Sequence, residues 1–308
     1  MQISPWYSNS MSIRCTQPAP TSGIVLHGMT IPKRILIVDD DPGIHRLLGD
    51  ALHSEDRQID SSFDGDDALA RIKKVPYALV LADVQMPGLN GLALLECVRR
   101  ICPATKVLVM TVENSPENVV WAIRKHAFSF FSKPFPISSL SEMVKTGLKS
   151  IEWEDDIEVT SAHPNWIALR LRCKVDAVDR IVQFLRELAP DLSQGEQENL
   201  ATALREILMN ATEHGGGSDP RQEVIVTYVR GSRSLVYYVR DPGAGFSFED
   251  LSHAAVSNPP DSPFEHADIR ERMGLRPGGF GILLTRKLVD ELIYNETGNE
   301  VLLIKYLP

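Results

Sequence analysis

Residues 35–42, ILIVDDDP, and residues 79–91, LVLADVQMPGLNG, decide the fold of the first half of the chain. Each stretch begins with a continuous run of apolar residues that ends at aspartate. Similar apolar runs occur at 107–110 and 128–131, and a shorter strand is expected near 58–62. Continuous rather than alternating apolar runs indicate strands buried on both faces, as in a parallel sheet covered by helices.

Segments with helical periodicity separate these strands. Helices are expected at 44–54, 66–74, 91–101, 116–125 and 137–149. Regular alternation of strands and helices predicts an α/β, flavodoxin-like, doubly wound fold with a parallel sheet. In such folds, ligands bind beyond the carboxyl ends of the strands.

Polar residues stand at those strand ends, namely Asp39, Asp40, Asp83, Thr111 and Lys133. Two unit charges about 4 Å apart repel by about 4 kcal/mol at an effective dielectric of about 20, so three carboxylates favour a bound Mg²⁺. A lysine and a threonine hydroxyl suit an incoming phosphoryl group. The set predicts attack by a carboxylate on phosphorus to give an aspartyl phosphate, although each aspartate alone would be read as a solvated loop residue.

These stretches, with VLVMTVENS at 107–115 and FFSKPF at 130–135, closely resemble the response-regulator receiver domain over residues 33–149. The resemblance implies that Asp83 is the phosphoacceptor and that Asp39 and Asp40 hold Mg²⁺ beside it. It also implies a cognate sensor histidine kinase as partner.

By the same resemblance, Thr111 and Lys133 contact the phosphoryl group, and the Lys133–Pro134 bond is the family's cis peptide. Phe130, three residues before Lys133, occupies the aromatic switch position of the family.

The remaining chain divides by composition. Residues 1–32 are expected to be a disordered tail or to precede the natural start, and the acidic residues 150–165 are expected to form a solvated linker. Helices combined with antiparallel hairpins over 166–308 predict an α/β two-layer sandwich. The expected elements are a strand at 167–173, a helix at 175–188, a helix starting at an S-x-x-E capping box at Ser193, a hairpin of strands 223–229 and 235–240, a loop at 246–277, a helix at 281–291 and a hairpin around Gly298.

Three groups of residues in this half carry candidate chemistry. A Glu and an Asn four residues apart share a helix face, glycines follow an aspartate after a strand, and further glycines open a helix that can bind phosphate. Alone, the first group is more often a helix-surface hydrogen bond and the second is most often a plain turn, whereas a flexible loop explains the third about as well. The groups are Glu206 with Asn210, Asp241 with Gly243 and Gly245, and Gly278 with Gly279 and Gly281.

Their order along the chain matches the GHKL ATPase superfamily, and with His214 in the same helix the half looks most like anti-sigma-factor serine/threonine kinases. The resemblance implies that Glu206 is the general base, that Asn210 binds Mg²⁺ and that Asp241 reads adenine.

The same resemblance implies that Gly243 and Gly245 belong to the family's first glycine box and that Gly279 and Gly281 cradle phosphate. Arg276 is a candidate contact to the γ-phosphate, with Arg270 and Arg272 competing for the role. The subfamily usually has Gly-Thr in the last hairpin, whereas this chain has Gly298 followed by Asn299. Asn299 is a possible substitute. Trp166 is expected in the core.

Composition limits the remaining possibilities. The net charge is −9, and no large cluster of Lys and Arg occurs, which argues against DNA as a partner. No apolar run approaches the roughly 20 residues that span a bilayer, so no membrane segment is expected. Four cysteines without a CxxC pair indicate a reduced compartment, and we expect a cytoplasmic protein.

Three functions remain open. The first is a protein serine/threonine kinase that uses ATP and Mg²⁺, acts on an anti-sigma antagonist-type partner and is controlled by phosphorylation of Asp83. The second is an inactive, nucleotide-dependent binding module that sequesters a sigma factor or its antagonist. The third, a histidine kinase fragment, is the weakest because no dimerisation helix offers a phosphorylatable histidine. Glu206 favours the first, since pure binding needs no general base. A homodimer is possible.

Overall fold

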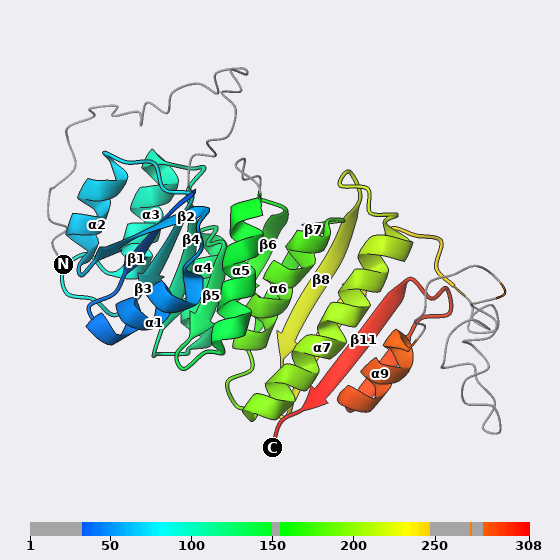
Figure 1. Cartoon of the computed structure of the whole chain (residues 1–308). Helices are drawn as coiled ribbons and strands as arrows, with labels where there is room; N and C mark the ends of the chain where they lie inside the picture. The colour runs from blue at the N-terminus through cyan, green and yellow to red at the C-terminus, as the bar shows by residue number, and fades with distance from the viewer. Residues whose placement is uncertain (1–32, 150–154, 247–271, 273–279) are drawn as a thin grey trace, which may run out of the picture. The chain divides into compact units, whose positions relative to one another are not determined.

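The computed structural model describes residues 33–149, 155–246, 272 and 280–308 (Figure 1). The expected tail at 1–32 and nearly all of the expected loop at 246–277 lie outside these residues. Contacts divide the chain into two compact units, Met1–Val107 and Leu108–Pro308. The division falls inside the fourth strand and not near residue 150, so the end of the first sheet belongs to the same unit as the whole of the second.

The first sheet, sheet A, has the strand order β2-β1-β3-β4-β5, which is the flavodoxin-like order. The pairs β1·β2, β1·β3 and β4·β5 are parallel. In β1 the side chains from Ile35 to Val38 are all 0% exposed, as a strand with both faces covered requires. The predicted doubly wound α/β fold is confirmed. The strands are β1 Lys33–Val38, β2 Arg57–Ser62, β3 Leu79–Asp83, β4 Lys106–Thr111 and β5 Ser129–Ser132.

The helices of this half begin at side chains that cap them. Asp41, Asp64, Asn90 and Ser115 each accept a hydrogen bond from a backbone N–H in the first turn of the helix that follows. All five helices start and end within two residues of the predicted bounds. They are α1 Pro42–Leu52, α2 Gly65–Ile72, α3 Gly91–Ile101, α4 Pro116–Arg124 and α5 Ile137–Lys149.

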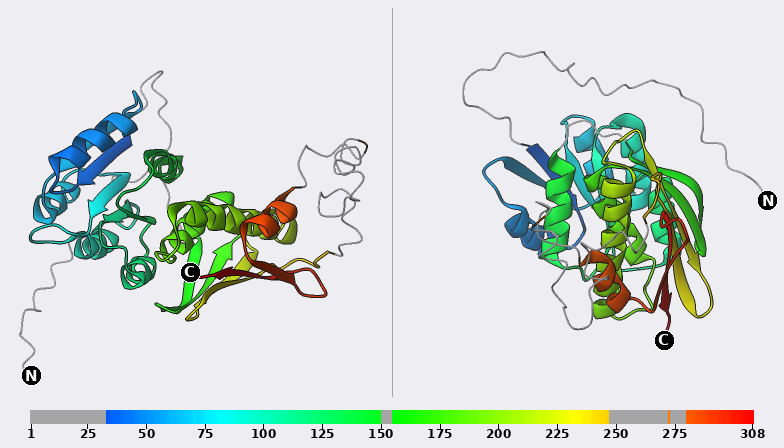
Figure 2. Two further views of the ribbon diagram at one scale, coloured as in Figure 1. Left: turned by 90° about the horizontal axis from the view of Figure 1, so that it is seen from below. Right: turned by 90° about the vertical axis from the view of Figure 1, so that its right-hand side faces the viewer.

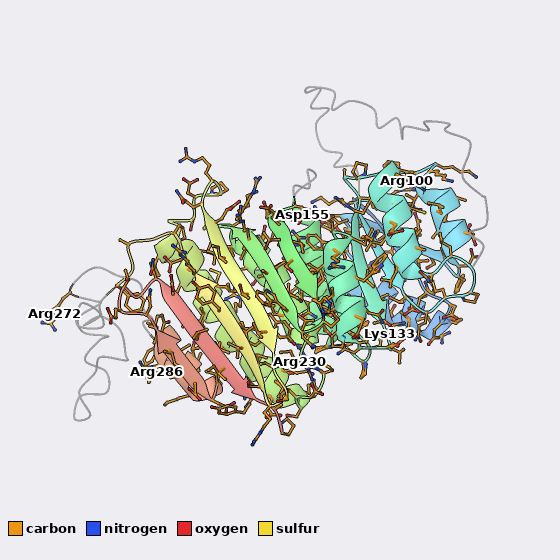
Figure 3. All side chains as sticks on the ribbon, turned by 180° about the vertical axis from the view of Figure 1, so that it is seen from behind. Arg100, Lys133, Asp155, Arg230, Arg272 and Arg286 are labelled. Carbon is orange, nitrogen blue, oxygen red and sulfur yellow. The ribbon has the colours of Figure 1, made fainter. Side chains whose placement is uncertain are left out.

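The second sheet, sheet B, is antiparallel, with the strand order β10-β11-β9-β8-β7-β6. Its helices lie on one face of the sheet (Figure 2, left), and in Figure 3 the strands lie in front of them. The predicted two-layer sandwich is therefore confirmed. The strands are β6 Ile157–His163, β7 Trp166–Arg172, β8 Glu223–Arg230, β9 Ser234–Arg240, β10 Glu291–Tyr294 and β11 Glu300–Tyr306.

Helices α6 Val175–Glu187, α7 Gln194–Asn210 and α9 Gly281–Leu288 form the second layer, with a π-helical turn, η1 Ala211–Gly215, directly after α7. His214 therefore lies in this turn and not in the same α-helix as Glu206. None of the helices in the described ranges is both long and apolar enough to cross a membrane.

Two expected boundaries differ from the structure. The expected solvated linker contains β6, which pairs with β7 along its length, so sheet B starts inside the acidic segment. The helix expected at 281–291 ends at Leu288, because Val289 adopts an extended conformation and the chain continues into β10.

The expectation that Trp166 lies in the core is wrong. Side chains alternate between the two faces of a strand. In β7, Ile167, Leu169 and Leu171 point into the core and are at most 1% exposed, whereas Trp166 lies on the other face and is 56% exposed.

The predicted capping box opens α7, the helix that carries Glu206 and Asn210. The Ser193 hydroxyl accepts a hydrogen bond from the Glu196 N–H, and the Glu196 carboxylate accepts one from the Ser193 N–H at 3.0 Å. Both backbone donors are thereby satisfied, which fixes the first residue of the helix.

We expect Ser193→Ala to lower the free energy of unfolding by about 1 kcal/mol, because it removes the acceptor for a first-turn N–H. Urea denaturation followed by circular dichroism measures the change. Ser138→Ala, at an exposed serine in α5, is the control and should change little. Equal midpoints for both variants would contradict a stabilising capping box.

Candidate functional site

Three carboxylates meet at the carboxyl edge of sheet A. Asp39 and Asp40 follow β1, and Asp83 ends β3. One carboxylate oxygen from each lies within 4.8 Å of the others. Asp39 and Asp83 are 0% and 3% exposed, whereas Asp40 is exposed. Buried anions this close repel one another, and a hard divalent cation with oxygen ligands relieves the repulsion. The donor set fits Mg²⁺.

Backbone contacts hold these carboxylates in place. The Asp41 N–H donates to Asp39 Oδ1 at 3.0 Å, and the Gln85 N–H donates to Asp83 Oδ2 at 2.9 Å. These hydrogen bonds orient carboxylate oxygens of the kind that bind a hard divalent cation.

The predicted phosphoryl contacts lie at the ends of the next two strands. Thr111 closes β4 and is 0% exposed, and Lys133 directly follows β5. The Lys133 N–H donates to the Thr111 carbonyl oxygen at 2.6 Å, which holds the two strand ends together. The Lys133–Pro134 bond is cis, as expected. Phe130 is 0% exposed within β5.

A second candidate site is a cavity of about 430 Å³ at one end of sheet B. Pockets for small ligands have volumes of this order. Residues from all three predicted groups line it, although they are far apart in the sequence. Those predicted residues are Glu206 and Asn210 from α7, Asp241, Gly243 and Gly245 after β9, and Gly281 from α9, with His214 and Asn299 beside them.

The start of α9 lies directly against the Glu206 side chain. A Cβ atom built on Gly281 would lie 2.6 Å from Glu206 Oε2 and 3.7 Å from Asn210 Nδ2. Only glycine lets the backbone come this close without moving the carboxylate. The amino end of a helix and a Glu–Asn pair therefore lie side by side in the lining of the cavity, an arrangement suited to phosphate and a cation.

Asp241, which directly follows β9, also lines the cavity. Burial raises the pKa of its carboxyl group. The Gly243 N–H donates to Asp241 Oδ1 at 2.8 Å, and the Asp241 N–H donates to the Asn299 carbonyl oxygen at 3.0 Å. A Cβ on Gly215 would lie 2.4 Å from Asp241 Oδ1, so the π-helical turn packs against the carboxylate. The sequence analysis did not identify Gly215.

The last hairpin contributes Asn299 where the resembling family has threonine. Its Nδ2 donates to the Gly243 carbonyl oxygen at 3.3 Å, so it reaches the first glycine box. Gly298, at φ +82°, forms the turn that brings it there. This contact places the Asn299 side chain at the first glycine box, and its substitution for threonine stays a prediction.

Two aromatic residues of the cavity were missed. Phe246 and Tyr294 meet edge-on with ring centroids 5.3 Å apart, and both line the cavity. Burial raises the pKa of Tyr294 to about 12. Tyr294 falls in a strand just beyond the expected helix, which is why the pattern gave no signal for it.

The remaining predicted residues are three arginines and two glycines between residues 270 and 279. Arg270, Arg276, Gly278 and Gly279 lie outside the described residues. Arg272, labelled in Figure 3, is exposed and does not line the cavity.

Comparison with known proteins gives independent support for the two halves. A family model described as the response regulator receiver domain matches residues 35–145, and one described as the histidine kinase-like ATPase domain matches residues 171–305. The transcriptional regulatory protein GlrR of Escherichia coli K12 is 30% identical over 118 residues, which cover 38% of this chain and 27% of GlrR. TrcR of Mycobacterium tuberculosis is 32% identical over 109 residues, 35% of this chain and 42% of TrcR.

The chain thus spans less than half of the length of these relatives. Among solved structures, the receiver domain of NtrX from Brucella abortus is 34% identical and covers 38% of this chain and 98% of that chain, with a TM-score of 0.36. Together with the two matched family models, the parallel sheet with its three carboxylates and the sandwich with its cavity lead to one assignment. The chain contains a response regulator receiver domain followed by a histidine kinase-like ATPase domain.

Proposed function

We propose that the chain is a two-component response regulator that is phosphorylated on Asp83 and controls an ATP-dependent protein serine/threonine kinase in its second half. The observation that carries the proposal is that Glu206, Asn210, Asp241 and Gly281 line the same cavity. A phosphotransfer enzyme needs an activating base, a cation ligand, a base-reading group and a phosphate cradle close together. A partner of the anti-sigma antagonist type would supply the hydroxyl.

In the receiver, Asp83 would be the nucleophile that takes a phosphoryl group from a sensor histidine kinase. Asp39, Asp40 and Asp83 would hold Mg²⁺, which supplies charge neutralisation at the phosphoryl oxygens. Thr111 and Lys133 would bind those oxygens, and their backbone link at 2.6 Å supports a shared role.

In the second half, Glu206 would accept the proton of the substrate hydroxyl, and Asn210 would be a ligand of the Mg²⁺ that accompanies ATP. The Asp241 carboxylate would accept a hydrogen bond from the exocyclic amine of adenine. Its neighbour Asn299 would keep the glycine box in place through the contact to Gly243. The amino end of α9 would bind phosphate through the N–H groups of its first turn.

The first prediction concerns the receiver. With a small-molecule phosphodonor and Mg²⁺, the wild type should gain one phosphoryl group by intact mass spectrometry, and Asp83→Asn should gain none. Asp50→Asn, at an exposed aspartate in α1, is the control and should react like the wild type. Phosphoryl incorporation into Asp83→Asn would assign the nucleophile elsewhere.

The second prediction concerns nucleotide binding. Gly215→Ala should weaken the binding of a fluorescent ATP analogue by about tenfold or more, because the added methyl group displaces the Asp241 carboxylate and a hydrogen bond to a charged group contributes about 1.5–3 kcal/mol. Gly195→Ala is the matched control, since nothing lies within 4 Å of its added Cβ. Equal dissociation constants for the two variants would remove Asp241 from the nucleotide site.

The third prediction tests catalysis itself. The chain is incubated with γ-labelled ATP, Mg²⁺ and candidate antagonist proteins. Glu206→Gln should lower phosphoserine or phosphothreonine formation by about 10²–10⁴-fold, the range for a lost general base, while nucleotide still binds. Glu213→Gln, at an exposed glutamate of η1, is the control.

If the wild type binds ATP and transfers nothing to any partner, the kinase proposal fails. The second half is then a nucleotide-dependent module that binds a sigma factor or its antagonist.

A further inference from the structure

Helix α6 carries three buried polar side chains on one face. Arg180, Gln183 and Glu187 are 3%, 7% and 6% exposed, and their spacing of three and four residues places them side by side. Charged residues are almost never buried unless they are paired. The opposite face of α6 is apolar and covers sheet B, so this polar face must have a second partner.

That partner is β5, the edge strand of sheet A. Arg180 Nε donates to the Phe128 carbonyl oxygen at 3.0 Å, and Gln183 Nε2 donates to the Phe130 carbonyl oxygen at 3.0 Å. The Glu187 carboxylate accepts hydrogen bonds from the Ser132 hydroxyl and, at 3.3 Å, from the Ser132 N–H. We call Arg180, Gln183 and Glu187 the edge clamp.

The clamp bonds to every second residue along this segment, namely Phe128, which directly precedes β5, and Phe130 and Ser132 within it. Residues two apart direct their backbone groups to the same side of a strand, so the three bonds occupy consecutive positions that a neighbouring strand would otherwise fill. The clamp is also tied internally, because Gln183 Nε2 donates to Glu187 Oε1 at 2.8 Å. Burial raises the pKa of Glu187 to about 7, as expected for a carboxyl group kept out of water.

Further contacts surround the clamp. Asp155, labelled in Figure 3, pairs with both His126 and Arg180. Arg124, the last residue of α4, donates to the Ala162 carbonyl oxygen on β6. These bonds all lie within the unit Leu108–Pro308.

The edge clamp lies between elements that lead to the two candidate sites, with β5 leading to Lys133 and α6 packing on the helix that carries Glu206. Ser132 immediately precedes Lys133, whose N–H donates to Thr111. Helix α6 also packs along α7. Arg205 of α7, which directly precedes Glu206 in the sequence, forms an ion pair with Asp179 of α6, with 2.9 Å between Arg205 Nε and Asp179 Oδ1. One helix therefore lies between the strand that precedes Lys133 and the helix that carries the Glu–Asn pair.

We propose that the edge clamp couples the two sites, so that a phosphoryl group at Asp83 and a nucleotide in the cavity change each other's affinity through α6. The proposal rests on the proposed function of both sites. Movement of the Ser132–Lys133 segment must either carry α6 with it or break buried hydrogen bonds to charged groups, and leaving a buried charge unpaired is strongly unfavourable. Coupling requires an element with discrete arrangements that both sites bias, and in this proposal α6 is that element.

The experiment measures binding of a fluorescent ATP analogue to the full chain with Mg²⁺, with and without beryllofluoride as the phosphoryl mimic. In the wild type, beryllofluoride should change the dissociation constant by about fivefold or more. Binding linkage is reciprocal, so the nucleotide should change the beryllofluoride affinity by the same factor. Beryllofluoride binding is followed by intrinsic fluorescence.

The clamp variants are Glu187→Gln and Ser132→Ala. In both, beryllofluoride should change the dissociation constant of the ATP analogue by less than about twofold, while each ligand still binds alone. Gln183→Met replaces them if either fails to fold. Asp176→Asn is the matched control, because it removes the exposed Lys149–Asp176 pair, at 3.1 Å, between α5 and the same helix. Exposed pairs contribute little, so the control should keep the wild-type factor.

Retention of the wild-type factor in the clamp variants would overturn the proposal, as would a wild type that binds both ligands without any change in either affinity. That second result leaves the proposed function intact. Failure of the wild type to bind nucleotide at all would overturn both, which separates the two failures.

Discussion

Backbone groups at the edge of a β-sheet have no neighbouring strand, and within a protein they must still find hydrogen-bond partners. Sheet A ends at β5 and sheet B ends at β6. Here side chains from helices supply the partners. Arg180 and Gln183 of α6 donate to carbonyl groups just before and within β5, and Arg124 of α4 donates to a carbonyl group of β6. Each family domain thus satisfies an edge of the other, and all of these bonds lie within the unit Leu108–Pro308.

The cavity in the second half depends on a different constraint, the close approach of backbone to charged side chains. Gly281 lies against Glu206, and Gly215 lies against Asp241. Any Cβ atom at either position would move a carboxylate that the proposed chemistry needs in place. Asn299 adds a hydrogen bond to Gly243 from the last hairpin. Four separated segments therefore define one site, and the positions of its charges follow from main-chain contacts.

Much of this organisation could be predicted from the sequence because local pattern determines it. Buried parallel strands are continuous apolar runs, and the polar residues at their ends mark one edge of the sheet. The three groups of the second half could be placed in one site only because their order along the chain matches a known family. Spacing alone does not predict a contact between Glu206 and Gly281, which are 75 residues apart. The chemical roles of these residues remain predictions.

The missed features share a physical cause. The acidic surroundings of β6 are typical of a solvated linker, yet the strand is held by pairing with β7. Arg180, Gln183 and Glu187 have the spacing of a solvent-facing helix stripe, and only a partner from the other domain makes that stripe buried. Trp166 was expected in the core, although its place in the alternation of β7 puts it on the outer face. Periodicity reports that a face is polar or apolar but not what covers it.

The edge clamp also affects how such a chain can be recombined. A domain joined to its neighbour only by a flexible linker could be exchanged as a module. In this chain the receiver's last strand is completed by α6, and the segment expected to be the tether is itself a strand of the output sheet. A cut at the junction of the two family domains would leave an edge strand and buried charges open to water. The unit of exchange is therefore a receiver together with the helix face that matches it, so new pairings require complementary changes on both sides.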